Sequence, residues 1–237
     1  MVSITIGMRA FIKVCLVLTI LVGAAAATLG GYAFFITRQA GSLLKDITAL
    51  RVGSSSEADV ERLAKVHGRY VTSKDDEGNG FSIRFTVWNT WLSTLRLEPP
   101  ACFGAAVSVR RGRVYHIGVW LMRSMDIFPT FQASAGDVDE YAEYPGYISD
   151  MHSADYEFPT PIGKPYLRVL LDSHASPLQR QHAFDFSFRC LIKPGGGCDL
   201  PCDYLPSAWQ DWEAELRTDG YVDLFNQAYP KNSRCRP

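Results

Sequence analysis

The side chains that could carry catalysis are few and scattered along the chain. Its five histidines are His67, His116, His152, His174 and His182. The chain contains no H-E-x-x-H zinc motif, no G-x-S-x-G nucleophile elbow and no Walker phosphate loop. A dispersed triad could still combine a serine with Asp172 and either His152 or His174, because such triads need no fixed sequence order. Nearly any chain of this size allows that combination, so the sequence assigns no catalytic residue and favours a non-catalytic protein.

Cysteines are the next chemically informative residues, and five of the six lie beyond residue 36. These disulfide candidates are Cys102, Cys190, Cys198, Cys202 and Cys235. Cys198-x3-Cys202 has no second cysteine pair or H-x3-5-H unit to complete a zinc site, so the spacing favours disulfides. The turn residues 194–197 (PGGG) would bring Cys190 back toward Cys198 or Cys202. Because five is odd, at least one thiol stays free, and the pairing is left open. We expect no metal and no cofactor.

Basic and acidic residues are segregated along the chain. Between residues 84 and 123 six arginines are opposed only by Glu98. The arginines at the tip of a predicted hairpin are candidates for contact with an anionic surface: Arg110, Arg111 and Arg113. Two of the 24 basic residues, Arg9 and Lys13, precede residue 14, so the part after residue 36 has 25 acids against 22 bases. This slightly acidic balance argues against a nucleic-acid partner.

Acids and tyrosines are interleaved in the stretch from residue 137 to 163, which contains no basic residue before Lys164. A long loop of this composition suits ligand or partner binding, because loops carry function and aromatic side chains anchor interfaces. It lacks the D-x-[DN]-x-[DN]-G spacing of a calcium loop. The predicted binding residues are Tyr141, Tyr144, Tyr147, Tyr156, Asp139, Glu140 and Glu143. The alternative interpretation is a solvated loop.

These residues must be positioned relative to one uncharged segment, Val14 to Ile36. Its 23 residues would form a helix of roughly 35 Å, against a bilayer hydrocarbon core of about 30 Å. A cleaved signal peptide is the main alternative, with 25–27 (AAA) as the cleavage site. Apolar residues resume from Leu29 onward, which favours an uncleaved anchor over a signal peptide.

Flanking charges and cysteines predict the orientation. Arg9, Lys13 and the N-terminal amine lie on one side of the segment, which favours an internal N-terminus and an extracytoplasmic C-terminal domain. None of the four asparagines lies in an N-x-[ST] sequon, so we expect a bacterial plasma (inner) membrane rather than a glycosylated ectodomain. Small residues at Gly23, Ala27 and Gly31 share one helix face and predict close approach of two membrane helices, hence a homodimer.

The chain divides into a tail (1–13), a transmembrane helix (14–36), a polar connector (37–53) and one domain (54–237). A helix is predicted over 57–66, with Val60, Leu63 and Val66 on one face, and another from Ser207 to Arg217. Strands are predicted over 81–87, 103–109, 114–122 and 166–171, and over 184–190, where Phe184, Phe186, Phe188 and Cys190 alternate with polar residues. The fold class is therefore α+β, with a mostly antiparallel sheet of about five strands and two flanking helices.

The run Leu50 to Val60, LRVGSSSEADV, resembles the start of the small lipoproteins that assemble outer-membrane proteins, whose first helix begins G-x-[ST]-x-x-[DE]-V. The resemblance implies a small helix-and-sheet scaffold that binds partners without chemistry. This chain lacks the family's lipid-modified cysteine, and the match covers eleven residues.

Together these features predict a single-pass, membrane-anchored protein with an extracytoplasmic binding or envelope-assembly domain. Its expected partners are the lipid bilayer, another envelope protein and a second copy of the chain. The alternative is an exported, membrane-tethered hydrolase with a dispersed His/carboxylate site.

Overall fold

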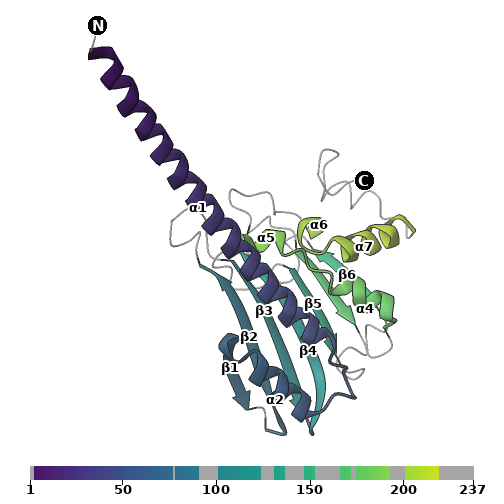
Figure 1. The fold of residues 1–237 in the computed structure, drawn as a ribbon. Coiled ribbons are helices and arrows are strands. Elements are labelled where there is room, and N and C mark those ends of the chain that lie inside the picture. The colour runs from purple at the N-terminus through teal and green to yellow at the C-terminus, as the bar shows by residue number, and fades with distance from the viewer. Residues whose placement is uncertain are drawn as a thin grey trace.

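The fold comes from a computed structural model, which describes residues 3–76, 78–90, 101–123, 131–136, 147–152, 166–171, 175–192 and 201–218. A single helix, α1 (Ser3–Thr48), extends from the N-terminus and runs without interruption onto one face of a β-sheet (Figure 1). Shorter helices lie around the sheet, with α4 and α7 beside its far edge from β1 and β2 (Figure 1).

The sheet has the strand order β1-β2-β3-β4-β5-β7-β6. Its first four strands form an antiparallel meander: β1 (Val71–Asp76), β2 (Gly80–Asn89), β3 (Ala101–Arg110) and β4 (Arg113–Arg123). The order continues with β5 (Phe131–Gly136), β7 (Tyr166–Leu171) and β6 (Tyr147–His152). Strands β5 and β7 are the one parallel pair among those described; the other pairs are antiparallel.

The core lies between the sheet and the C-terminal part of α1. In β2, alternate residues from Phe81 to Val87 are buried, as the period of two in a strand requires. From α1, the buried residues are spaced by three or four positions, which places them on one helix face: Ile36, Ala40, Leu43 and Ile47. The predicted polar connector over 37–53 is therefore wrong for residues 37–48, which continue α1 and supply one layer of the core.

Helix α2 (Glu57–Val66) begins as predicted. Ser56 is its N-cap, and the Asp59 carboxylate accepts hydrogen bonds from the Ser56 backbone N–H (2.9 Å) and hydroxyl (2.8 Å). These bonds hold the pKa of Asp59 below its ordinary value. Of the three residues predicted to share one face, Val60 and Leu63 are buried, whereas Val66 is 68% exposed.

The predicted hairpin between β3 and β4 is confirmed. Its two-residue turn places Arg111 at φ 52° and Gly112 at φ 75°, the pair of positive angles that matches the twist of the flanking strands. Backbone hydrogen bonds from Glu57 N to the Gly112 carbonyl (3.0 Å) and from Val114 N to the Ser55 carbonyl (2.9 Å) join this turn to the start of α2.

The C-terminal region corrects one predicted strand. Residues 184–188 form no strand but connect α4 (Pro177–Ala183) to α5 (Arg189–Ile192). Phe184, Phe186 and Cys190 are nevertheless buried, so the apolar alternation reports burial without a strand. Helices α6 (Pro201–Tyr204) and α7 (Pro206–Thr218) follow, and α7 begins one residue before the predicted Ser207.

The α+β class is confirmed by the antiparallel strands β1–β4 and the helices packed on them. The expected count of about five strands is too low, because the described sheet has seven. Strand β1 (VTSKDD) is an edge strand with mostly exposed side chains, so it lacks the apolar alternation that a sequence search requires.

Two glycines test the packing directly. At Gly104 in β3, an added Cβ would lie 2.2 Å from the Trp120 indole ring, which therefore covers this glycine from the neighbouring strand β4. At Gly41 in α1, an added Cβ would meet only Phe188 Cε2, at an ordinary 3.8 Å.

We predict that Gly104→Ala lowers the free energy of unfolding by about 1–3 kcal/mol through overpacking. Gly41→Ala, the matched control, should raise it by about 0.5–1 kcal/mol, because alanine is the better helix former. Denaturant unfolding of both variants measures this difference. Equal stability of the two variants would contradict the described packing of Trp120.

Candidate functional site

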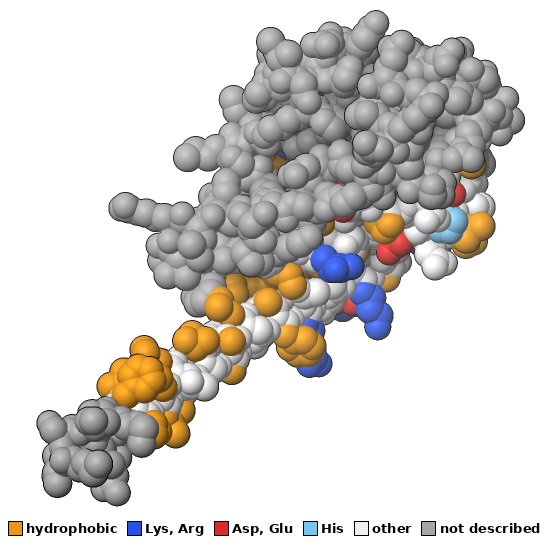
Figure 2. Space-filling view, turned by 90° about the horizontal axis from the view of Figure 1, so that it is seen from above, with side chains coloured by type: hydrophobic (Ala, Val, Ile, Leu, Met, Phe, Trp, Pro, Cys, Tyr) orange, Lys and Arg blue, Asp and Glu red, His pale blue; other side chains and the backbone are white. Residues whose placement is uncertain are grey.

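The protruding part of α1 is the most conspicuous surface of the molecule. Its side chains from Phe11 to Gly31 are all exposed, and the hydrophobic ones line the rod-like extension (Figure 2). By length and composition, the helix over Phe11–Thr48 could cross a membrane, and none of its most apolar window is buried in the protein. An unpartnered apolar helix of this length fits a bilayer better than water.

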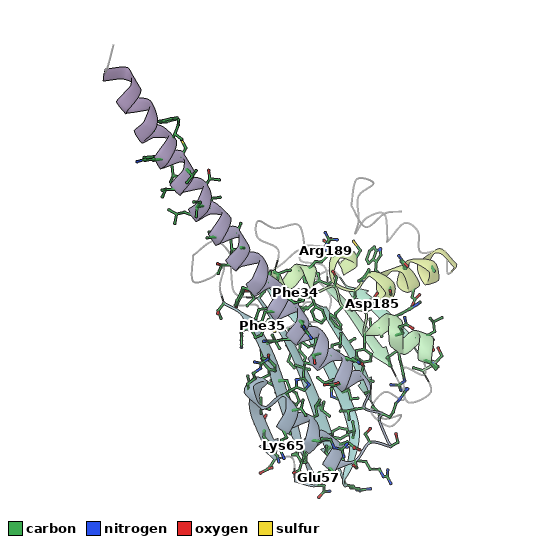
Figure 3. The ribbon with its side chains drawn as sticks, in the orientation of Figure 1. Phe34, Phe35, Glu57, Lys65, Asp185 and Arg189 are labelled. Atoms are coloured by element: carbon green, nitrogen blue, oxygen red, sulfur yellow. The ribbon has the colours of Figure 1, made fainter. Side chains whose placement is uncertain are left out.

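The exposed part of α1 gives way to the docked part between residues 32 and 36, where Tyr32 is already half-buried against the core. Phe34 is 67% exposed, whereas Ile36 is 6% exposed, and Figure 3 shows Phe34 and Phe35 where the helix leaves the domain. The Arg69 guanidinium lies 5.7 Å from the Phe35 ring centroid and 4.6 Å from that of Tyr70. Aromatic and basic side chains at this boundary are typical of residues at a membrane–water interface.

The predicted dimer face lies entirely on the protruding part. Gly23, Ala27 and Gly31 are exposed, and a Cβ added at Gly23 or Gly31 would meet nothing within 4 Å. Larger side chains there would therefore leave the fold undisturbed.

The three arginines of the β3–β4 turn are exposed, but two of them make local contacts. The Arg110 guanidinium stacks over the Tyr115 ring at 4.1 Å, and Arg113 Nη1 donates a hydrogen bond to the Ser54 carbonyl (3.2 Å). Arg113 thus helps attach the hairpin to the segment before α2.

Of the predicted tyrosine and acid set, only the Tyr147 backbone is described, at the start of β6. Tyr141, Tyr144, Tyr156, Asp139, Glu140 and Glu143 lie outside the described residues, as do Cys198 and Cys235.

The described cysteines differ in chemical state. Cys15 and Cys102 are free thiols, whereas Cys190 and Cys202 are disulfide-bonded. Cys102 in β3 is buried, and that burial raises the pKa of its thiol to about 11. Cys102 therefore leaves the set of disulfide candidates.

A cavity of about 680 Å³ opens between the end of α1, helix α4 and the connection that follows α4. Its apolar lining comes from residues far apart in sequence: Leu44, Leu50, Ile117, Phe184, Phe186 and Phe188. Its polar rim consists of Lys45, Thr48, Arg51, Arg180, Gln181, His182, Asp185 and Ser207. No single motif joins these positions, so sequence reasoning missed the cavity, although it named His182 among the scattered histidines.

Two polar pairs occupy one side of this cavity. His182 Nδ1 lies 2.8 Å from Asp211 Oδ2, which joins α4 to α7. The Ser207 hydroxyl donates a hydrogen bond of 2.6 Å to Oδ2 of Asp185, a residue of the connection after α4 that is labelled in Figure 3. The serine is thus bonded to a carboxylate and not to the histidine, which is not the relay of a serine hydrolase.

The rim is electropositive. Three of its side chains carry a positive charge (Lys45, Arg51 and Arg180), against the single carboxylate of Asp185. Within the described part of the chain, no group of three or more His, Cys, Asp or Glu residues could hold a metal ion. An apolar floor beneath a basic rim suits a ligand with an apolar body and an anionic head.

Comparisons with protein-family models, with curated proteins and with solved structures gave no match for this chain. The segment Leu50–Val60 contains the capped start of α2.

The open face of the protruding helix generates a prediction about self-association. Gly23→Leu with Gly31→Leu should convert a homodimer of the reconstituted chain into a monomer, because leucine side chains prevent close approach of two helices. Cross-linking in proteoliposomes measures the change. Leu18→Ala with Val22→Ala, two exposed positions on the opposite face of the helix, is the control. An oligomeric state unchanged by the leucine pair would exclude this interface.

Proposed function

We propose that the protein is a single-pass, membrane-tethered binding module that holds its domain on the outer side of a plasma (inner) membrane. The observation that carries this proposal is the continuity of α1. One helix has a fully exposed apolar half and a second half whose Ile36, Ala40, Leu43 and Ile47 are buried in the domain core.

This continuity supports a rigid tether. Residues 14–36 would span roughly 35 Å at 1.5 Å per residue, which is enough for the hydrocarbon core of a bilayer. The docked part begins at the end of this segment, where Ile36 is 6% exposed, so the domain would lie directly against the membrane surface. A flexible connector would instead let the domain sample a range of heights.

The cysteines support an extracytoplasmic location. Disulfides persist in oxidising compartments and are rare in the cytosol, and Cys190 and Cys202 are both in the bonded state. The basic residues Arg9 and Lys13 before the apolar segment favour the same orientation. We propose that the remaining candidates, Cys198 and Cys235, complete this disulfide framework.

Three features support the binding role. The cavity beside α4 has the size and the mixed lining of a small-molecule site. The arginine turn of residues 110–113 and the acidic, tyrosine-rich stretch of residues 137–163 are proposed contacts for an envelope partner.

We predict that protease added to spheroplasts removes the domain from full-length protein, while the same cells before outer-membrane removal protect it.

Thiol mapping reports the redox state of the cysteines. In denaturant without reductant, maleimide should label Cys102 but not Cys190 or Cys202, and reduction should release both.

Cys102 supplies the internal control. Its raised pKa keeps the thiol protonated in the native protein at pH 8, so native labelling should be slow and should speed up only on unfolding.

The raised pKa of Cys102 also predicts that the free energy of unfolding falls as the pH rises from about 9 toward 11, where the unfolded thiol ionises and the native one does not. Full labelling of all cysteines without reductant would place the domain in a reducing compartment and overturn the proposed orientation.

The second candidate function is a membrane-tethered hydrolase, and the His182–Asp211 pair is the observation that favours it. A histidine held at Nδ1 by a carboxylate presents Nε2 for general-base chemistry. We predict no saturable hydrolysis of p-nitrophenyl acetate or octanoate that depends on His182. If His182→Gln lowers a saturable rate by about 10²-fold or more while His116→Gln does not, the hydrolase becomes the better assignment.

A further inference from the structure

The cavity beside α4 combines two properties that few surface hollows share. Its floor is made of core residues: Phe186 and Ile117 are buried, and the Phe188 ring packs edge-on against Phe103 at 5.2 Å between centroids. Because these rings belong to the packed core, the apolar floor is preformed, and ligand binding loses little side-chain conformational entropy there.

The basic side of the cavity comes from the end of α1. Lys45 lies in the last turn of α1, and Arg51 lies three residues after the end of that helix at Thr48. Both are exposed, and within the described part of the chain neither has a carboxylate within ion-pair distance. The nearest acid of the rim, Asp185, accepts its hydrogen bond from Ser207 instead.

We propose, on the premise that the protein is a binding module, that this cavity binds a single-chain amphiphilic anion. Its alkyl or aryl body packs on Phe184, Phe186 and Ile117, and its carboxylate or phosphate head lies between Lys45 and Arg51. The charge of the rim selects the sign of the ligand, because the exposed cations Lys45 and Arg51 attract an anion and repel an alkylammonium. The apolar floor selects a ligand with an alkyl or aryl body, because burying each methylene is favourable and a small inorganic anion cannot gain that contribution.

Gly41 offers a way to block the cavity without disturbing the fold. It lines the cavity from α1, and a Cβ there makes an ordinary 3.8 Å contact with Phe188 Cε2. Gly41→Leu therefore fills the apolar floor from a position where a side chain is tolerated. Ser42→Leu adds the same side chain one position along the helix, where residue 42 is exposed and outside the lining.

The test is titration calorimetry of the full-length protein in nanodiscs, with empty nanodiscs as the blank. The probes are octanoate, octyl phosphate, octylammonium and octanol, which share one chain and differ in head group. We expect saturable binding of octanoate, octyl phosphate or both, at least tenfold tighter than octylammonium or octanol. Comparison of octanoate with octyl phosphate identifies which head group the rim prefers.

The variants locate the site. Gly41→Leu should abolish binding while Ser42→Leu leaves it unchanged. Lys45→Gln with Arg51→Gln should weaken the anion roughly three- to tenfold, in line with two partly exposed ion pairs. Lys65→Gln with Arg84→Gln removes the same charge from exposed positions on α2 and β2 and should have no effect.

Several results would overturn this proposal. No saturable binding of either anion, equal binding of octylammonium or octanol, or wild-type binding by Gly41→Leu would each do so. These outcomes are separable from the tether itself: a chain that passes the spheroplast and thiol tests but binds neither anion remains a membrane-tethered module with a different ligand.

Discussion

The whole molecule depends on the packing of the second half of α1 against the sheet. Ile36, Ala40, Leu43 and Ile47 present one helix face to alternate residues of β2 and β3, such as Phe85 and Phe103. Burying a side chain the size of isoleucine or leucine contributes about 1.5–3 kcal/mol, so three such residues anchor the helix firmly. Without this contact the domain would lose one layer of its core, and the apolar half of the helix would lose its fixed direction.

A second contact secures the far end of the same helix. His67 Nε2, at the C-terminus of α2, lies 2.8 Å from Asp46 Oδ2, and the imidazole is buried. Helix α2 is in turn joined to the β3–β4 turn by backbone hydrogen bonds. The end of α1 is therefore held from two sides, by the sheet and by α2, and Lys45 and Arg51 project from a fixed piece of backbone.

Sequence reasoning reached the elements whose patterns are local. The capped start of α2, strand β2 and the β3–β4 hairpin each have a complete signal within about ten residues. The docked half of α1 was missed although Ile36, Ala40, Leu43 and Ile47 are spaced as one helix face. Polar neighbours such as Arg38 and Lys45 made the segment resemble a connector, and they prove to be the helix's exposed face. The strand predicted over residues 184–190 is wrong for the opposite reason, since the apolar alternation there reflects burial in the core and not pairing with a neighbouring strand. The cavity was out of reach because residues 41–51, 117, 177–188 and 207 meet only in the folded chain.

The rigid helix also limits what the cavity can meet. Its α1 lining begins at Gly41 and ends at Thr48, five to twelve residues beyond Ile36. At 1.5 Å per residue these positions lie at most roughly 8–18 Å above the start of the docked helix. If Ile36 marks the membrane surface, the cavity stands clear of the hydrocarbon, and no lipid can reach it with both chains still in the bilayer. A ligand must instead approach through water, where an amphiphile with one chain is soluble and a two-chain lipid is not. The same helix that would hold the domain at the membrane therefore restricts the cavity to molecules that have left it.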